Sequence, residues 1–102
     1  MVKRDDNIKK GAGIRIKLSD IPEGLSYHGE HLVSRHGSAF VVFSMRCTHL
    51  GCVLKVSSEG FLECPCHGSV FNPADGDPLR GPASRKLRKL DFKLDQEFLT
   101  LL

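Results

Sequence analysis

The chain has no tryptophan and only one tyrosine, and none of its basic runs is interleaved with aromatic residues. Proteins that hold single-stranded nucleic acid stack its bases on aromatic side chains within a basic groove, so we expect no nucleic-acid partner. The net charge of +3, from 15 basic and 12 acidic residues, is too small to indicate such a partner by itself.

Long apolar runs are absent as well. No stretch approaches the roughly 18 apolar residues that cross a bilayer, and residues 1–11 are too polar for a secretory signal peptide. The sequence therefore predicts a soluble chain. Any membrane association would need a segment that these 102 residues do not contain.

The size and composition are those of one small globular domain. With 102 residues, 40% apolar and 26% charged, the chain is long enough to bury a single core without help from metals or disulfides. Residues 1–11 are charged and show no periodicity, so we expect a flexible lead-in followed by one domain over residues 12–102.

The apolar pattern predicts strands throughout this domain and no helix. Ile14, Ile16 and Leu18 alternate with polar residues, as in a half-buried strand, whereas the apolar run at residues 39–45 is typical of a strand buried on both faces. A turn is expected at residues 20–24, a hairpin should join 53–56 to 61–63, and 72–83 should be an ordered loop without helix. Other short strands are expected at residues 31–35, 70–71, 90–94 and 98–102.

The predicted fold class is therefore all-β, a small antiparallel sandwich or barrel. Residues from about 46 to 83 should form an insertion at one end of it, with residues 12–45 and 84–102 as the base.

Two short loops of similar layout hold all four cysteines and two of the five histidines: Cys47-Thr48-His49-Leu50-Gly51-Cys52 and Cys64-Pro65-Cys66-His67-Gly68-Ser69. Thiolates and imidazoles are the ligands of zinc and of iron–sulfur centres. The four cysteines and two histidines are six candidate ligands for a site that needs four, and two interpretations are open. A structural zinc ion takes some four of them, or two cysteines and two histidines bind while the remaining cysteines form a disulfide. The like-for-like layout favours the second.

These two loops resemble, in sequence and in order, the two cluster-binding boxes of the Rieske iron–sulfur family, and Gly81-Pro82-Ala83 resembles the proline loop of that family. The strong part of the resemblance covers roughly residues 45–85. It implies a Rieske-like fold and a [2Fe–2S] cluster, with two thiolates on one iron and two imidazoles on the other. The implied ligands are Cys47 and Cys64 for the first iron and His49 and His67 for the second.

The resemblance also assigns roles to residues around the cluster. It implies a disulfide between Cys52 and Cys66, as in the Rieske subunits of cytochrome bc-type complexes and unlike the ferredoxins of oxygenases. Ser69 would donate a hydrogen bond to a bridging sulfide, and Leu50 and Pro82 would shield the cluster from water. Many high-potential members have a tyrosine where this chain has Phe71, so we expect a potential between the two branches.

One-electron transfer is the expected function, by an electron carrier or electron-transfer subunit rather than a free-standing enzyme. The first hypothesis is the soluble domain of a respiratory or quinol-oxidising protein, with a cytochrome among its redox partners and quinol as a further one. The second is a soluble ferredoxin that supplies an oxygenase or reductase, and the third is a structural zinc module. The disulfide favours the periplasm or the outer face of a membrane. A soluble cytoplasmic carrier is the alternative.

Basic residues gather towards the C-terminus, where Asp91 is the one acid among Arg80, Arg85, Lys86, Arg88, Lys89 and Lys93. The first interpretation is a solvated strand face, and the second is a docking surface for an acidic redox partner. The histidines outside the two boxes should lie on the surface or in turns and have no ligand role: His28, His31 and His36.

Overall fold

A computed structural model describes residues 13–102, which form three antiparallel sheets. The predicted lead-in lies outside these described residues. The first sheet has the order β1 (Arg15–Lys17), β10 (Phe98–Leu101), β9 (Phe92–Leu94), and the middle sheet has the order β2 (Gly24–His28), β3 (His31–His36), β4 (Ala39–Ser44). The third sheet runs β5 (Lys55–Val56), β6 (Leu62–Glu63), β7 (Val70–Phe71), β8 (Pro78–Arg80).

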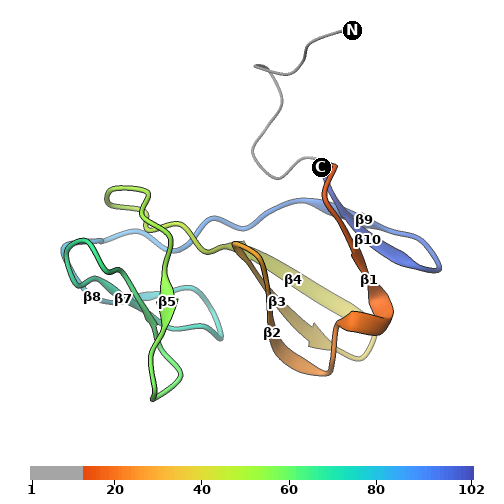
Figure 1. Ribbon diagram of the computed structural model, residues 1–102, viewed down its shortest axis with the longest axis horizontal. Coiled ribbons are helices and arrows are strands. Elements are labelled where there is room, and N and C mark those ends of the chain that lie inside the picture. The colour runs from red at the N-terminus through yellow and green to blue at the C-terminus, as the bar shows by residue number, and fades with distance from the viewer. Residues whose placement is uncertain (1–12) are drawn as a thin grey trace, which may run out of the picture.

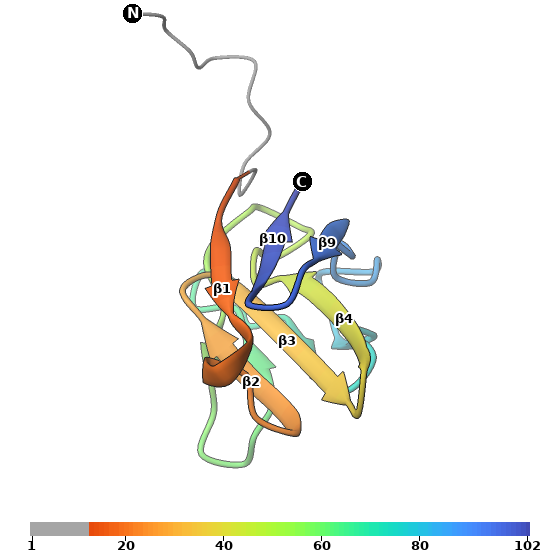
Figure 2. The same ribbon diagram turned by 90° about the vertical axis from the view of Figure 1, so that its right-hand side faces the viewer.

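Residues 13–102 contain no α-helix and a single 3₁₀ turn, η1 (Leu18–Asp20), which confirms the predicted all-β class. Figure 1 shows the middle sheet between the other two, with β5, β7 and β8 on one side and β1, β9 and β10 on the other. Seen from the side of the first sheet, β1, β10 and β9 lie in front of the middle sheet (Figure 2).

The middle sheet separates two apolar cores because successive side chains of a strand point to opposite faces. Val33 and Val42 are paired across β3 and β4 and pack in one core with Ile16, Leu99 and Leu101 of the first sheet.

The second core lies on the other face of the middle sheet. Leu32 and Phe43, which are also paired across β3 and β4, pack there with residues of the two cysteine loops and the third sheet. The expected burial of residues 39–45 on both faces is therefore confirmed at the centre of β4.

Two strands were missed by the sequence patterns. In β2 the apolar side chains of Leu25 and Tyr27 are about 40% exposed. The inward face of β2 therefore has no apolar residues that a sequence pattern could reveal. β8 begins at Pro78 inside the loop predicted at residues 72–83, and it pairs with β7 across a register shift. Proline is tolerated there because β8 is an edge strand and proline is its first residue. Residues 72–83 contain no helix, as predicted.

The chain returns from the third sheet by lying along β4. The N–H of Ser44 donates to the carbonyl of Arg88 at 2.8 Å, and the N–H of Leu90 donates to the carbonyl of Val42 at 2.8 Å. Residues 88–90 are therefore held against the free edge of the middle sheet, although sequence patterns gave no strand at residues 88–89.

Position 76 requires glycine, both for its backbone conformation and for the lack of space around it. Its φ of +77° is in the left-handed region, which disfavours a side chain. A Cβ atom at this position would lie 3.1 Å from Cε1 of Phe43 and 3.3 Å from Cβ of Leu87, both in the core around the cysteine loops.

We predict that Gly76→Ala lowers the free energy of unfolding by about 2–4 kcal/mol, from the left-handed backbone and the overpacked core together. Gly37→Ala is the matched control, because Gly37 also has a positive φ (+64°) but a Cβ there meets nothing within 4 Å. Its expected loss is about 1 kcal/mol. Urea unfolding of both variants measures the difference, and equal losses would contradict the packing argument.

Candidate metal centre

The two cysteine loops are closed by the same pair of backbone hydrogen bonds. In each, the N–H of the first residue donates to the carbonyl of the sixth, Cys47 to Cys52 and Cys64 to Ser69, both at 2.8 Å. The fifth residue is a glycine that donates back to the first carbonyl, Gly51 at 2.8 Å and Gly68 at 3.0 Å. Both glycines have φ near +80°, which other residues rarely adopt.

The structure divides the four cysteines into two pairs. Cys52 and Cys66 form a disulfide with a Cα–Cα distance of 6.6 Å, which confirms the predicted bridge between the loops. Cys47 and Cys64 are free thiols, each 3% exposed, and pack in the same apolar core. The Sγ atom of Cys64 also lies within 4.8 Å of both bridge sulfurs, but a disulfide sulfur is not a thiolate and offers no ligand comparable to Cys47.

The two predicted histidine ligands lie next to each other at the surface. Both His49 and His67 are exposed, their ring centroids are 5.6 Å apart, and their planes meet edge to face at 82°. Each loop therefore places its free cysteine inward and its histidine outward. Two buried thiols beside two exposed imidazoles fit a [2Fe–2S] cluster that has a sulfur-bound inner iron and an imidazole-bound outer iron.

Hydrogen bonds around Cys47 favour its thiolate form. Burial by itself raises the pKa of the Cys47 thiol, but hydrogen bonds from the N–H groups of His49 and Leu50 and from the Cys64 and Ser69 side chains outweigh it. The pKa of Cys47 therefore lies below its ordinary value, and the N–H of His49 is 3.4 Å from its Sγ atom. Thiolate is the form that binds metal ions.

Ser69 joins the second loop to the predicted proline loop. Its side chain is fully buried, and its Oγ accepts a hydrogen bond from the N–H of Ala83 at 3.0 Å. That contact leaves the hydroxyl hydrogen available to donate within the site. Pro82, which follows a cis peptide bond, and Leu50 are both exposed beside these loops.

Sequence reasoning missed two residues that hold the first loop in place. Thr48 donates through Oγ1 to the carbonyl of Arg85 at 2.8 Å, which attaches the loop to the segment after Ala83. Arg46 donates to the carbonyl of Gly51 at 3.0 Å and forms an ion pair with Glu30 at 2.9 Å. No local pattern could reveal them, because Thr48 is 37 residues from Arg85 and Arg46 is 16 from Glu30.

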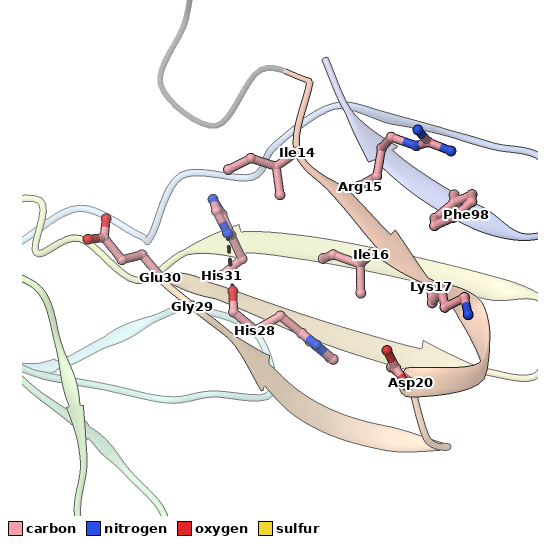
Figure 3. Close-up of a pocket in the computed structure, with 10 residues that line it drawn as sticks. All are labelled: Ile14, Arg15, Ile16, Lys17, Asp20, His28, Gly29, Glu30, His31 and Phe98. Atoms are coloured by element: carbon pink, nitrogen blue, oxygen red, sulfur yellow. Dashed lines mark hydrogen bonds between the residues drawn. The ribbon is translucent and has the colours of Figure 1, made fainter.

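The other histidines lie in the β2–β3 hairpin and bond to their own neighbours. Nε2 of His28 is 2.7 Å from the Ser26 hydroxyl, and Nδ1 of His31 is 3.2 Å from the His28 carbonyl. Both line a cavity of about 650 Å³ between β1 and this hairpin (Figure 3), in which Ile14 and Ile16 point towards the histidines. Burial lowers the pKa of His28 despite the opposing effect of Asp20, which favours the neutral ring in these partly apolar surroundings.

The family model for the Rieske [2Fe-2S] domain matches residues 1–91. The chain therefore belongs to the Rieske family, as its two loops predicted, and its cofactor is a [2Fe–2S] cluster that serves electron transfer. The zinc hypothesis is accordingly set aside.

Curated proteins of different kinds are similar to this chain. The chain is 43% identical over 72 residues to a carotenoid phi-ring synthase of Chlorobaculum tepidum, covering 69% of this chain and 11% of that protein. It is 35% identical over 88 residues to the chloroplastic cytochrome b6-f complex iron-sulfur subunit of Chlamydomonas reinhardtii, covering 80% and 42%. The chain thus spans less than half of these curated relatives, and within residues 13–102 no helix is long and apolar enough to cross a membrane.

Solved structures show the same fold. A chain of a hyperthermophilic respiratory Complex III is 29% identical with a TM-score of 0.63, and the match covers 88% of this chain and 75% of that one. The ferredoxin of carbazole 1,9a-dioxygenase from Nocardioides aromaticivorans has a TM-score of 0.53 at 22% identity, with 88% and 96% covered, which shows a likeness of fold alone.

We predict that the Cys52→Ala/Cys66→Ala variant loses about 3 kcal/mol of stability, because the bridge closes a loop of about 15 residues in the unfolded chain. Urea unfolding of the cluster-loaded protein, followed by visible absorption, measures the loss. Alkylation of the denatured wild-type protein provides the control: two cysteines should react without reductant and all four after reduction. Four reactive cysteines without reductant would contradict the bridge.

Proposed function

We propose that Cys47 and Cys64 bind one iron of the cluster and that His49 and His67 bind the other. The contrast in burial between the free thiols and the paired imidazoles supports this division, together with the disulfide that removes Cys52 and Cys66 from the ligand set. We further propose the domain division expected from the sequence, with residues 12–102 as one domain and about 46–83 as its cluster-binding part.

Replacing any one of the four proposed ligands by alanine should abolish or strongly reduce cluster content, since each removes one of four protein ligands. The ratio of iron and acid-labile sulfide to protein measures the effect, with visible absorption as a second readout. His36→Ala is the control, because His36 is exposed and lies in β3, outside both loops. A ligand variant that retains the full iron and sulfide content would contradict the assignment of that residue.

The cluster, when bound, accepts and releases one electron at a time. The exposed rings of His49 and His67 present its outer edge to a partner, whereas the buried Cys47 and Cys64 face the core. Leu50 and Pro82 lie exposed at this end of the molecule and would exclude water once a partner is bound. Ser69 would donate its hydroxyl hydrogen towards sulfur, and its side-chain hydrogen bond to Cys47 supports this role.

We propose, more specifically, that the chain is the soluble domain of a respiratory or quinol-oxidising electron-transfer protein. The Cys52–Cys66 bridge supports this, as does the 35% identity to a cytochrome b6-f iron-sulfur subunit. Its partners would be a cytochrome and a quinol, the latter bound at His49 or His67. It would work in the periplasm or on the outer face of a membrane, where disulfides persist, and reach the membrane through a segment outside this chain.

A soluble ferredoxin is the second candidate. The likeness of fold to the ferredoxin of carbazole 1,9a-dioxygenase is consistent with it, and so is Phe71, which is fully buried and supplies no hydroxyl donor near the cysteine ligands. Rieske potentials extend from about −150 to +300 mV, and quinol oxidation requires the upper part of that range. The reduction potential therefore distinguishes the two candidates.

We predict a wild-type potential between the extremes of this range, because one hydroxyl donor is kept and one is lost. Ser69→Ala should lower it and Phe71→Tyr should raise it, each by roughly 60–130 mV, if a hydrogen bond to the charged site is worth about 1.5–3 kcal/mol. Protein-film voltammetry measures all three values. A wild-type potential near −150 mV would favour the ferredoxin, and an unchanged potential in Ser69→Ala would contradict its role as a donor.

A further inference from the structure

A basic cavity of about 710 Å³ opens beside the first cysteine loop. Cys47, Thr48 and Gly51 form one wall, and the side chains of four cations line the rest: Arg46, Arg85, Lys86 and Arg88. No acidic residue of the described chain lines it. The six basic residues noted between residues 80 and 93 do not all belong here, because Arg80 lines a separate cavity with Glu59 and Glu63.

The cations are fixed relative to His49 by backbone contacts. The Arg85 carbonyl accepts the Thr48 hydroxyl at 2.8 Å, and Thr48 is the residue before His49. The Arg88 carbonyl is held by the edge of β4, and Leu87 between them is 3% exposed in the core. The exposed guanidinium groups therefore extend from a rigid segment next to the loop that presents an imidazole to solvent.

Two of the four cations have carboxylate partners, whereas the other two have none among the described residues. Arg46 pairs with Glu30 at 2.9 Å, and Lys86 pairs with Asp77 at 3.4 Å. Within residues 13–102, Arg85 and Arg88 have no carboxylate oxygen within 4.0 Å. Exposed guanidinium groups that share a concave surface concentrate positive potential there and favour planar, bidentate contacts with carboxylates.

We propose that this cavity, which Arg85 and Arg88 line, is the docking site for an acidic surface of the redox partner protein. Carboxylates of the partner enter the cavity and bring its redox centre to the exposed edge of His49. The proposal rests on the electron-transfer function proposed above and adds the charge of the partner and the side from which it approaches. A partner of this kind fits better than nucleic acid, since no aromatic side chain lines the cavity.

Stopped-flow oxidation of the reduced, cluster-loaded protein tests this with two probe proteins, an acidic plastocyanin and a strongly basic cytochrome c. At low ionic strength, Arg85→Gln/Arg88→Gln should slow the second-order reaction with plastocyanin roughly tenfold, and the difference should shrink as salt is added. The reaction with the basic cytochrome should not slow. Visible absorption and the reduction potential of each variant are measured first, so that rates are compared between loaded proteins of known driving force.

Lys17→Gln/Lys93→Gln is the matched control, because it removes the same charge from exposed positions on β1 and β9 of the first sheet. Slowing by the control as large as that by the arginine variant would overturn the proposal, since net charge alone would then explain it. Plastocyanin rates that do not change in the arginine variant would also overturn the proposal. Saturable, arginine-dependent binding of pyrophosphate in calorimetry would then indicate a small-anion site. A chain that assembles no iron and sulfide fails the proposed function instead.

Discussion

The two hydrogen bonds that close each cysteine loop are the constraint on which the site depends. They bring the first and sixth residues of a loop together only if the fifth residue adopts a left-handed backbone, and glycine provides this in both loops. Residues 72–77 form a third loop with the same two bonds and a glycine at the same place, but with no cysteine or histidine. The turn therefore belongs to the fold, and only the side chains on it distinguish the two loops of the proposed metal site from the third loop.

Rigid support explains how such short loops can hold ligands in place. The first loop begins shortly after β4, whose central residues Val42 and Phe43 are buried in opposite cores. Met45, which lies between β4 and the loop, is itself 4% exposed. The bridge from Cys52 to Cys66 then couples the two loops, and Ser69 couples the second loop to Ala83. Each contact joins segments that would otherwise move independently, so the site is held from three directions.

The sequence was most informative where a function requires particular residues at short spacing. The two loops stood out because cysteine, histidine and glycine recur in them at fixed intervals, and the resemblance to the Rieske family implied the disulfide that the structure confirms. The strands with inward apolar alternation could be predicted from their period of two. β2 was missed because its apolar residues face solvent, and β8 because proline usually ends a strand. The contacts of Arg46 and Thr48 that hold the first loop were missed because their partners, Glu30 and Arg85, are distant in sequence and come close only in the folded chain.

Burial separates Ser69, which we propose tunes the cluster, from Arg85 and Arg88, which we propose receive a partner. Ser69 is fully buried, so a hydrogen bond from it acts in a low dielectric and is little affected by salt. Arg85 and Arg88 are exposed, and charges in water are screened beyond about 8 Å at physiological ionic strength. Screening is weakest at contact distance, so we expect the arginines to act mainly on a partner that touches them. If both proposals hold, electron affinity depends on a buried residue and association on exposed ones, so the two properties are set by different parts of the site.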